Sequence, residues 1–305
     1  MHDLAALSLD ALFNHLTADG SLERLLEAAR DEDLSAIGDV TSLIMIESSA
    51  AGIAVLRTRA EGVIAGLAAM PAVLNAFHAE VIWQPTAQDG DVVAAGQTLG
   101  RLEGNMRDLL ALERTALNLI CRLSGIATLT RRYVKALRGS TTSICDTRKT
   151  TPGLRTLEKY AVRCGGGTLH RMGLFDAVLI KDNHLSGIEP DQLTDVLNQS
   201  LRDVRTRSEI AFVEVEVDSL DQLERVMACA VGLVDMVLLD NMSIEQLSQA
   251  VVRRNAMAPS IQLEASGGIT LERVAEIAAT GVDRISVGAL THSATALDIG
   301  LDIEE

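Results

Sequence analysis

Aromatic residues are scarce in this sequence, where Phe, Tyr and Trp together make up 2% of 305 residues. Hydrophobic residues nevertheless reach 48%, so aliphatic side chains and methionine have to build the core. Long apolar runs are also lacking: the longest candidate, around Gly62 to Leu74, contains Pro71 and falls short of the roughly 18 residues that a membrane-spanning helix needs. The N-terminal MHDLAALSLD lacks the Lys or Arg of a secretory signal. We therefore expect a globular protein with no membrane partner.

Cysteine is sparse as well. Cys121, Cys145, Cys164 and Cys229 form no C-x-x-C pair and show no disulfide-rich spacing, which favours a reduced, cytoplasmic protein. A nucleophilic role for Cys164 is disfavoured, because no His–Asp arrangement that could activate its thiol is evident.

Basic residues are outnumbered, since 27 Lys and Arg against 42 Asp and Glu give a net charge of −15. This balance argues against general binding to nucleic acid or to an acidic membrane. Positive charge is nevertheless concentrated between Arg148 and Lys181, where seven basic residues are accompanied only by Glu158 and Asp176. The segment indicates either a focused anion site or a solvated basic helix face.

The first ~120 residues have the patterns of mixed α and β structure. Helical spacing predicts a helix at 22–34, and alternation predicts a strand at 52–60. Tight turns are expected near Gly90, Gly96 and Gly100. Two helical stretches, at 106–122 and 124–138, then lead into the second half of the chain.

From about Ser143 onward, short apolar runs alternate with helix-like segments. The expected strands lie at 143–147, 177–181, 212–217, 236–240, 262–266 and 284–288. The expected helices lie at 154–162, 191–201, 219–230, 243–254 and 270–280. Such alternation predicts right-handed βαβ units and a parallel sheet. Six strands are fewer than the eight of a closed barrel, so we expect an open or incomplete parallel α/β barrel, with a doubly wound sheet as the alternative.

Functional residues of α/β barrels collect at the carboxyl ends of the strands. All six expected strand ends carry charged or glycine-rich residues: Arg148, Lys149, Lys181, Glu216, Asp240, Ser266, Gly267, Gly268, Gly288 and Ala289. Glycines before helix starts suit phosphate binding, and barrels often place a phosphate in the loops after the last two strands. The two glycine-containing loops therefore predict a phosphate site, whereas either one alone favours a simple tight turn.

Glu216 and Asp240 end consecutive strands and are expected to lie near one another. Beside a phosphate they suit Mg²⁺, ribose hydroxyls or a developing cationic centre. A salt bridge from Glu216 to Lys181 or Arg148 is the structural alternative. Glu214 shares a face of the strand with Glu216 and is the rival carboxylate.

His170 and Arg171 follow Gly165–Gly167, a run too flexible for a helix interior, and lie inside the basic segment. We favour a turn held by side-chain hydrogen bonds over a metal site for Asp182-Asn183-His184.

Several long motifs identify a family resemblance. They are DTRKTTPGLRTLEKYAVRCGGG, HRMGLFDAVLIKDNH, VEVEVDSLDQL, VLLDN, EASGGI and VGALTHS, with ERTALN from Glu113 and SGIAT from Ser124. Together they closely resemble quinolinate phosphoribosyltransferase, from about Glu32 to Asp302. The resemblance implies an α/β sandwich at 1–124, an α/β barrel at 125–290 and a C-terminal tail at 291–305 packed on the N-terminal domain. It also implies homodimers or multiples of dimers.

The resemblance implies the substrates as well. Quinolinate and phosphoribosyl pyrophosphate would give nicotinate mononucleotide, pyrophosphate and CO2 in NAD biosynthesis, with Mg²⁺ and no organic cofactor. The positions matching the quinolinate pocket are Arg148, His170, Arg171 and Lys181, with Arg114 from the neighbouring subunit. Lys149 and the loops Ser266–Gly268 and Gly288–Ala289 match the phosphate-binding positions, while Glu216 and Asp240 match those that handle ribose and Mg²⁺. Lys149, Lys181, Glu216 and Asp240 are the expected catalytic residues.

One position departs from the family pattern. Bacterial relatives commonly have Asn before the His-Arg pair, where this sequence has Leu169. A lost hydrogen bond there is expected to tune how His170 is oriented.

Two other functions remain open at this point. A related transferase could use another acceptor, such as nicotinate, or be a paralogue linked to molybdate transport. A phosphosugar-binding protein without turnover is the non-enzyme alternative, and the intact Lys149, Lys181, Glu216 and Asp240 argue against it.

Overall fold

The computed structural model describes residues 4, 6–207 and 210–304. Contacts within the chain divide the described residues into two compact units. One comprises 132–149 and 167–292, and the other comprises 4–131, 150–166 and 293–304. The domain limits that the sequence predicts, at 124/125 and 290/291, stay predictions.

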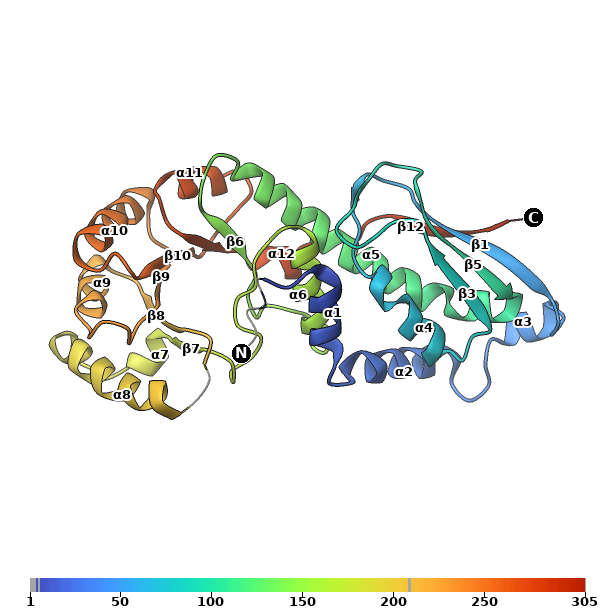
Figure 1. Cartoon of the computed structure of the whole chain (residues 1–305), viewed down its shortest axis with the longest axis horizontal. Coiled ribbons are helices and arrows are strands. Elements are labelled where there is room, and N and C mark those ends of the chain that lie inside the picture. Colours follow the sequence, from blue (N-terminus) through green and yellow to red (C-terminus); the bar gives the residue numbers. More distant parts are fainter. Residues whose placement is uncertain (1–3, 5, 208–209, 305) are drawn as a thin grey trace. The chain divides into compact units, whose positions relative to one another are not determined.

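The first unit is built on a sheet of six parallel strands (Figure 1). The strands are β6 (Ser143–Cys145), β7 (Val178–Ile180), β8 (Val213–Val217), β9 (Met236–Asp240), β10 (Gln262–Ser266) and β11 (Arg284–Ser286). Their order is β6-β11-β10-β9-β8-β7, so the first strand pairs with the last and the second strand forms the opposite edge. This is the order of an α/β barrel left open between β6 and β7, as the sequence predicts. The doubly wound alternative is wrong.

Helices follow the strands β7 to β11. They are α7 (Asp182–Leu185), η2 (Pro190–Gln192), α8 (Leu193–Arg207), α9 (Leu220–Met227), α10 (Ile244–Met257), α11 (Val274–Ala279) and α12 (Ala289–His292). The expected start of a helix near Thr270 is wrong, because turn residues precede α11 and the helix begins only at Val274. The SGG loop therefore stands apart from the helix N-terminus.

The second unit contains an antiparallel sheet in the order β12-β1-β5-β3. Its strands are β1 (Ala51–Thr58), β3 (Val81–Pro85), β5 (Thr98–Asn105) and β12 (Ile299–Glu304). A small second sheet pairs β2 (Gly62–Val63) with β4 (Val92–Val93). Strand β12 comes from the C-terminal end of the chain and pairs with β1 along six residues, from Ile53↔Glu304 to Thr58↔Ile299.

Helices complete this unit. They are α1 (Leu9–Thr17), α2 (Ser21–Leu34), α3 (Val40–Met45), η1 (Leu67–Ala69), α4 (Met70–Ala76), α5 (Met106–Ala136, which continues into the first unit) and α6 (Arg155–Cys164). Figure 1 shows α4 and α5 beside the antiparallel sheet, with α2 next to α4. No helix of the described residues is both long enough and apolar enough to cross a bilayer.

Helix α5 corrects the expectation of two helical stretches, because it runs without a break through Ser124 and Gly125. The Ser124 hydroxyl donates to the carbonyl of Ala65 and accepts from its amide, so its polar atoms are satisfied without ending the helix. A Cβ on Gly125 would lie 2.1 Å from the carbonyl oxygen of Thr295. This glycine therefore serves close packing rather than a turn.

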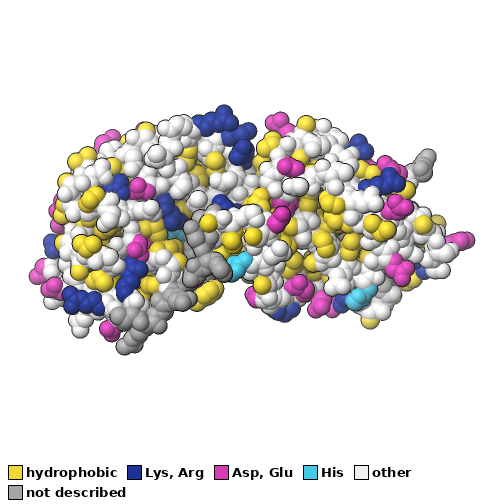
Figure 2. Space-filling model, viewed as in Figure 1, with side chains coloured by type: hydrophobic (Ala, Val, Ile, Leu, Met, Phe, Trp, Pro, Cys, Tyr) yellow, Lys and Arg dark blue, Asp and Glu magenta, His cyan; other side chains and the backbone are white. Residues whose placement is uncertain are grey.

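Figure 2 shows acidic and basic side chains interspersed on the viewed face of each unit. On this face the net negative charge is thus not gathered into one patch.

Candidate active site

A pocket of about 840 Å³ opens at the carboxyl ends of the parallel strands. Twelve of the predicted site residues line it: Arg148, Lys149, His170, Arg171, Lys181, Glu216, Asp240, Ser266, Gly267, Gly268, Gly288 and Ala289. The parallel topology explains the convergence, because all six strands deliver their last residues to one edge. The remaining predicted residue, Arg114, lies on α5 in the other unit, and its side chain is 66% exposed.

The basic segment divides between the two units. Four of its seven cations, Arg148, Lys149, Arg171 and Lys181, line the pocket. The other three, Arg155, Lys159 and Arg163, belong to α6 in the other unit, where Lys159 is completely buried. The interpretation as a solvated basic helix face is therefore wrong. The pocket residues form a concentrated cationic site in an acidic protein, which suits an anionic ligand.

Two guanidinium groups share this pocket. Burial lowers the pKa of Arg171, and the positive charge of Arg148 lowers it further. Two like charges held close together at a buried site repel one another and have lost much of their hydration. An anion bound between them offsets both costs. Each guanidinium also offers a planar set of donors that matches a carboxylate.

Two aspartates that the sequence analysis missed anchor the loop carrying Arg171. At one end, the buried Asp146 accepts a hydrogen bond from the amide of His170 at 2.8 Å. At the other, Asp176 accepts from the amides of Met172 at 2.7 Å and Gly173 at 2.9 Å. Asp146 belongs to the quoted DTRKTT motif, so its place beside Arg148 was the available signal.

Glu216 lies on β8 and Asp240 ends the neighbouring strand β9, and both carboxylates line the pocket. Glu216 accepts from the ammonium of Lys181, so the salt bridge considered as an alternative does form. Asp240 accepts from the side-chain amide of Asn241 at 2.7 Å. The pocket therefore holds both acidic groups within its cationic lining.

The glycines of the two loops act in different ways. Gly267 adopts φ +93°, and a Cβ there would lie 2.1 Å from Oδ1 of Asn241, which itself has φ +52°. Gly288 has no positive φ, but a Cβ there would lie 2.9 Å from Cδ of Lys149. Gly267 therefore allows β9 and β10 to end in close contact, and Gly288 leaves room for the Lys149 side chain.

This packing predicts unequal effects of two neighbouring substitutions. Gly267→Ala should lower the free energy of unfolding by about 1–3 kcal/mol, because it adds both a clash and backbone strain. Gly268→Ala is the matched control: its φ is +59° and a Cβ there meets nothing within 4 Å. Urea denaturation of both variants measures the difference. Equal losses in the free energy of unfolding would show that contact with Asn241 does not determine the conformation of the loop.

Glu214, the rival carboxylate, is fully buried and is not among the residues that line the pocket. Its Oε2 lies 2.8 Å from Nε2 of His170. Burial raises the pKa of Glu214 to about 7, against the opposing effect of nearby Arg284. Within the described residues, Glu216 is thus the carboxylate of β8 that faces the pocket.

The remaining alternatives are resolved by local contacts. Asp182, Asn183 and His184 form the single turn α7, in which His184 Nδ1 accepts from the amide of Lys181 at 2.9 Å. This is the side-chain-bonded turn that the sequence predicts.

Burial raises the pKa of the Cys164 thiol well above its ordinary value, which opposes formation of a nucleophilic thiolate. Residues lining the pocket that the sequence analysis did not select include Asn241, Glu264, Thr270, Ser286 and His292.

Most of the chain matches one family of known proteins. Residues 39–124 match the family described as quinolinate phosphoribosyl transferase, N-terminal domain, and residues 126–302 match its C-terminal domain. A nicotinate-nucleotide pyrophosphorylase [carboxylating] of Mycobacterium leprae is 43% identical over 288 residues, covering 91% of this chain and 98% of the relative. A probable enzyme of the same name from Bacillus subtilis is 38% identical, covering 95% and 94%.

A solved structure agrees with these sequence relatives. The nicotinate-nucleotide pyrophosphorylase from Francisella tularensis has a TM-score of 0.84 and 37% identity, covering 94% of this chain and 97% of that one.

Proposed function

Since the chain belongs to the quinolinate phosphoribosyltransferase family, we propose that it transfers phosphoribosyl from phosphoribosyl pyrophosphate to quinolinate. The products are nicotinate mononucleotide, pyrophosphate and CO2, as the relatives' name of carboxylating nicotinate-nucleotide pyrophosphorylase implies for the reverse direction. This reaction supplies NAD biosynthesis. A cytoplasmic location stays a prediction.

The convergence of four cations with three carboxylates, those of Glu216, Asp240 and Glu264, in one pocket is the observation that carries this proposal. Quinolinate is a dianion and the sugar donor carries several negative charges. Each substrate therefore needs cations in the pocket to compensate for the hydration that it loses on binding. Arg148 and Arg171 suit the two planar carboxylates of quinolinate, whereas Lys149 suits phosphate oxygens as a point charge. The loops Ser266–Gly268 and Gly288–Ala289 line the same pocket, and their glycines let a phosphate approach the backbone.

The chain's residues can promote two successive steps. The pyridine nitrogen attacks the anomeric carbon while the bond to pyrophosphate breaks, and positive charge develops on the ribose. Glu216 and Asp240 place negative charge where that cation forms, which stabilises the transition state. The ring nitrogen of the adduct is then cationic, and its positive charge stabilises the electron pair that the breaking C2–carboxylate bond leaves on C2 as CO2 departs. A proton replaces CO2 at C2 and completes the nicotinate ring.

Mg²⁺ fits the same pocket, because Glu216 and Asp240 offer hard oxygen ligands beside the phosphate-binding loops. These two residues would hold the ion, directly or through water. When bound, Mg²⁺ would neutralise charge on the departing pyrophosphate.

Exchanging arginine for lysine tests the quinolinate pocket. Arg148→Lys and Arg171→Lys should each weaken quinolinate binding by about 1.5–3 kcal/mol, because one point charge replaces a planar pair of donors. Affinity for phosphoribosyl pyrophosphate should change much less. Calorimetric titration with each substrate measures both effects. Unchanged quinolinate affinity in both variants would remove these arginines from the pocket.

The choice of acceptor separates this proposal from the related transferase. Purified protein with phosphoribosyl pyrophosphate and Mg²⁺ is given quinolinate in one reaction and nicotinate in another, and nicotinate mononucleotide is measured. We expect product from quinolinate only. Product from nicotinate alone would favour a transferase with a different acceptor, and binding without turnover in either reaction would favour a sugar-phosphate sensor.

We also propose a homodimer, or a multiple of dimers, in which Arg114 acts at the partner's site. Two observations support it: the side chain of Arg114 is 66% exposed, and none of the residues described as lining the main pocket comes from α5. Arg114 instead borders a smaller cavity of about 250 Å³, which residues of α2 and α5 line with several leucines, Glu32 and Asp33.

A further inference from the structure

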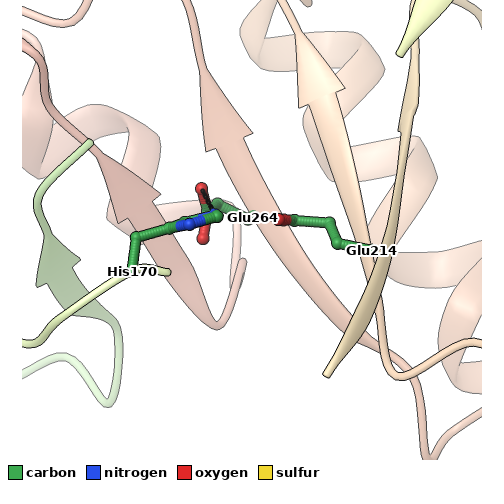
Figure 3. A group of neighbouring side chains, drawn as sticks. All are labelled: His170, Glu214 and Glu264. Carbon is green, nitrogen blue, oxygen red and sulfur yellow. Dashed lines mark hydrogen bonds and ion pairs between the residues drawn. The ribbon is translucent and has the colours of Figure 1, made fainter. Parts of the chain in front are cut away.

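Three buried side chains meet at the wall of the main pocket, which His170 and Glu264 line (Figure 3). His170 follows the glycine run, Glu214 lies on β8 and Glu264 lies on β10. Figure 3 shows the imidazole ring of His170 and the Glu214 carboxylate pointing toward one another, with Glu264 beside them. Nε2 of His170 lies 2.8 Å from Glu214 Oε2 and 3.6 Å from Glu264 Oε1.

The other ring nitrogen of His170, Nδ1, faces a group that can only donate a hydrogen bond. The backbone amide of Arg171 donates to Nδ1 of His170 at 2.8 Å. A backbone amide can only donate, so Nδ1 must offer its lone pair and cannot carry a proton. Nε2 then carries the proton of the neutral ring, and a carboxylate oxygen of Glu214 is a matching acceptor. The two hydrogen bonds thus specify one tautomer.

We infer that His170 is held as the neutral tautomer protonated at Nε2, with Glu214 as the positioning residue. This inference deepens the proposed function, since it reassigns one member of the quinolinate pocket. The positive charge of that pocket then comes from Arg148, Lys149, Arg171 and Lys181. His170 acts through its neighbour: its Nδ1 fixes the backbone of Arg171.

The surroundings of the ring support this assignment. Phe212 packs edge-on against His170, with ring centroids 5.2 Å apart and planes at 88°, which limits rotation of the imidazole. The amide of His170 itself is held by Asp146. Ring, backbone and carboxylate are therefore fixed together, as a preorganised binding loop requires.

The same three side chains have the atom types of a metal site, but their neighbours favour a proton between them. Arg284 lies 3.0 Å from Glu264 Oε2 and already supplies a positive charge to the buried carboxylates. The Cys145 thiol donates to the same oxygen at 3.4 Å. A divalent cation would have to enter beside the buried guanidinium of Arg284, and the 2.8 Å separation of Nε2 and Oε2 is already that of a direct hydrogen bond.

Nitrogen-15 labelling of histidine in the full chain tests the assignment directly. In long-range proton–nitrogen spectra at neutral pH, His170→Asn identifies the His170 signals by their loss. We expect one protonated and one unprotonated ring nitrogen, with the proton on Nε2, in the free protein and with quinolinate. Two protonated nitrogens, a proton on Nδ1, or a stoichiometric transition metal in elemental analysis would each overturn the inference. The free-protein spectrum is independent of turnover, so failure of the proposed function leaves this result interpretable.

Paired variants give a second readout. Glu214→Leu removes the acceptor and should raise the quinolinate KM about tenfold, with a smaller change in kcat, because one hydrogen bond to a buried group is lost. Glu214→Gln keeps a carbonyl acceptor of the same shape and should raise KM much less. Equal losses in the two variants would show that the charge of Glu214, and not its acceptor, is what matters.

A pair at position 170 tests the charge itself. His170→Asn retains an acceptor near the amide of Arg171, whereas His170→Lys supplies a cation without one. The inference predicts the lower quinolinate KM for His170→Asn. A lower KM for His170→Lys would instead identify His170 as a cation that binds the substrate.

Discussion

Glu216→Gln and Asp240→Asn should each lower kcat by about 10²- to 10³-fold, because a group that stabilises developing charge typically contributes that much to the rate. Both substitutions preserve side-chain size and remove the negative charge, so the fold should survive. If the carboxylates act mainly on the cationic transition state, the loss appears in kcat and not in the quinolinate KM. Glu216→Gln also releases Lys181 from its ion pair, so the two variants need not be equal.

Steady-state kinetics at saturating Mg²⁺ measure these losses. Asp218→Asn is the matched control, since Asp218 is exposed, lies two residues beyond Glu216 and is not among the residues that line the main pocket. It should behave as wild type. Wild-type kcat in both Glu216→Gln and Asp240→Asn would exclude these carboxylates from the reaction.

Mixed dimers should recover activity that neither parent variant has. If Arg114 serves the partner's site, each site combines Lys149 of one chain with Arg114 of the other. Arg114→Ala and Lys149→Ala homodimers should then be nearly inactive, because every site lacks one cation. After the two variants are unfolded and refolded together, about half of the dimers are mixed, and each mixed dimer holds one intact site. About a quarter of wild-type activity should return by this symmetry.

Native mass spectrometry of the refolded sample establishes that subunits have exchanged. A sample of Arg114→Ala refolded with itself is the control and should stay inactive. If mixed dimers are present and activity does not return, Arg114 acts within its own chain or supports only the fold.

The strand framework could be predicted because its physical signals are local. The six parallel strands are short apolar runs, and charged or glycine residues stand where each run ends. β9, for example, is buried along Met236–Leu239 and reaches the pocket at Asp240. A sheet buried on both faces requires such runs, and parallel strands bring their ends to one edge.

Some features of the fold depend on distant contacts that local signals do not show. Gly125 resembles a helix end in sequence, yet it allows α5 to pack against the backbone of Thr295. Helix α6 follows β6 in the βα alternation, but its residues group with the other unit, where Tyr160 packs edge-on against Phe13. Neither partner is near in sequence, so periodicity could not reveal them.

The candidate active site shows the same division. Its charged residues could be selected from strand ends and from the family motifs. The contact between His170 and Glu214 joins residues 44 positions apart, and the tautomer it implies depends on a backbone amide. Sequence pattern placed Glu214 on the same face as Glu216, whereas the structure buries one carboxylate and leaves the other at the pocket.

The stoichiometry of one labelled reaction tests the central claim most directly. Quinolinate carrying carbon-13 in its 2-carboxylate is incubated with phosphoribosyl pyrophosphate, Mg²⁺ and the protein. The proposed reaction predicts labelled CO2, unlabelled nicotinate mononucleotide and pyrophosphate in equal amounts. Pyrophosphate release without labelled CO2, or a nucleotide that retains the label, would contradict it.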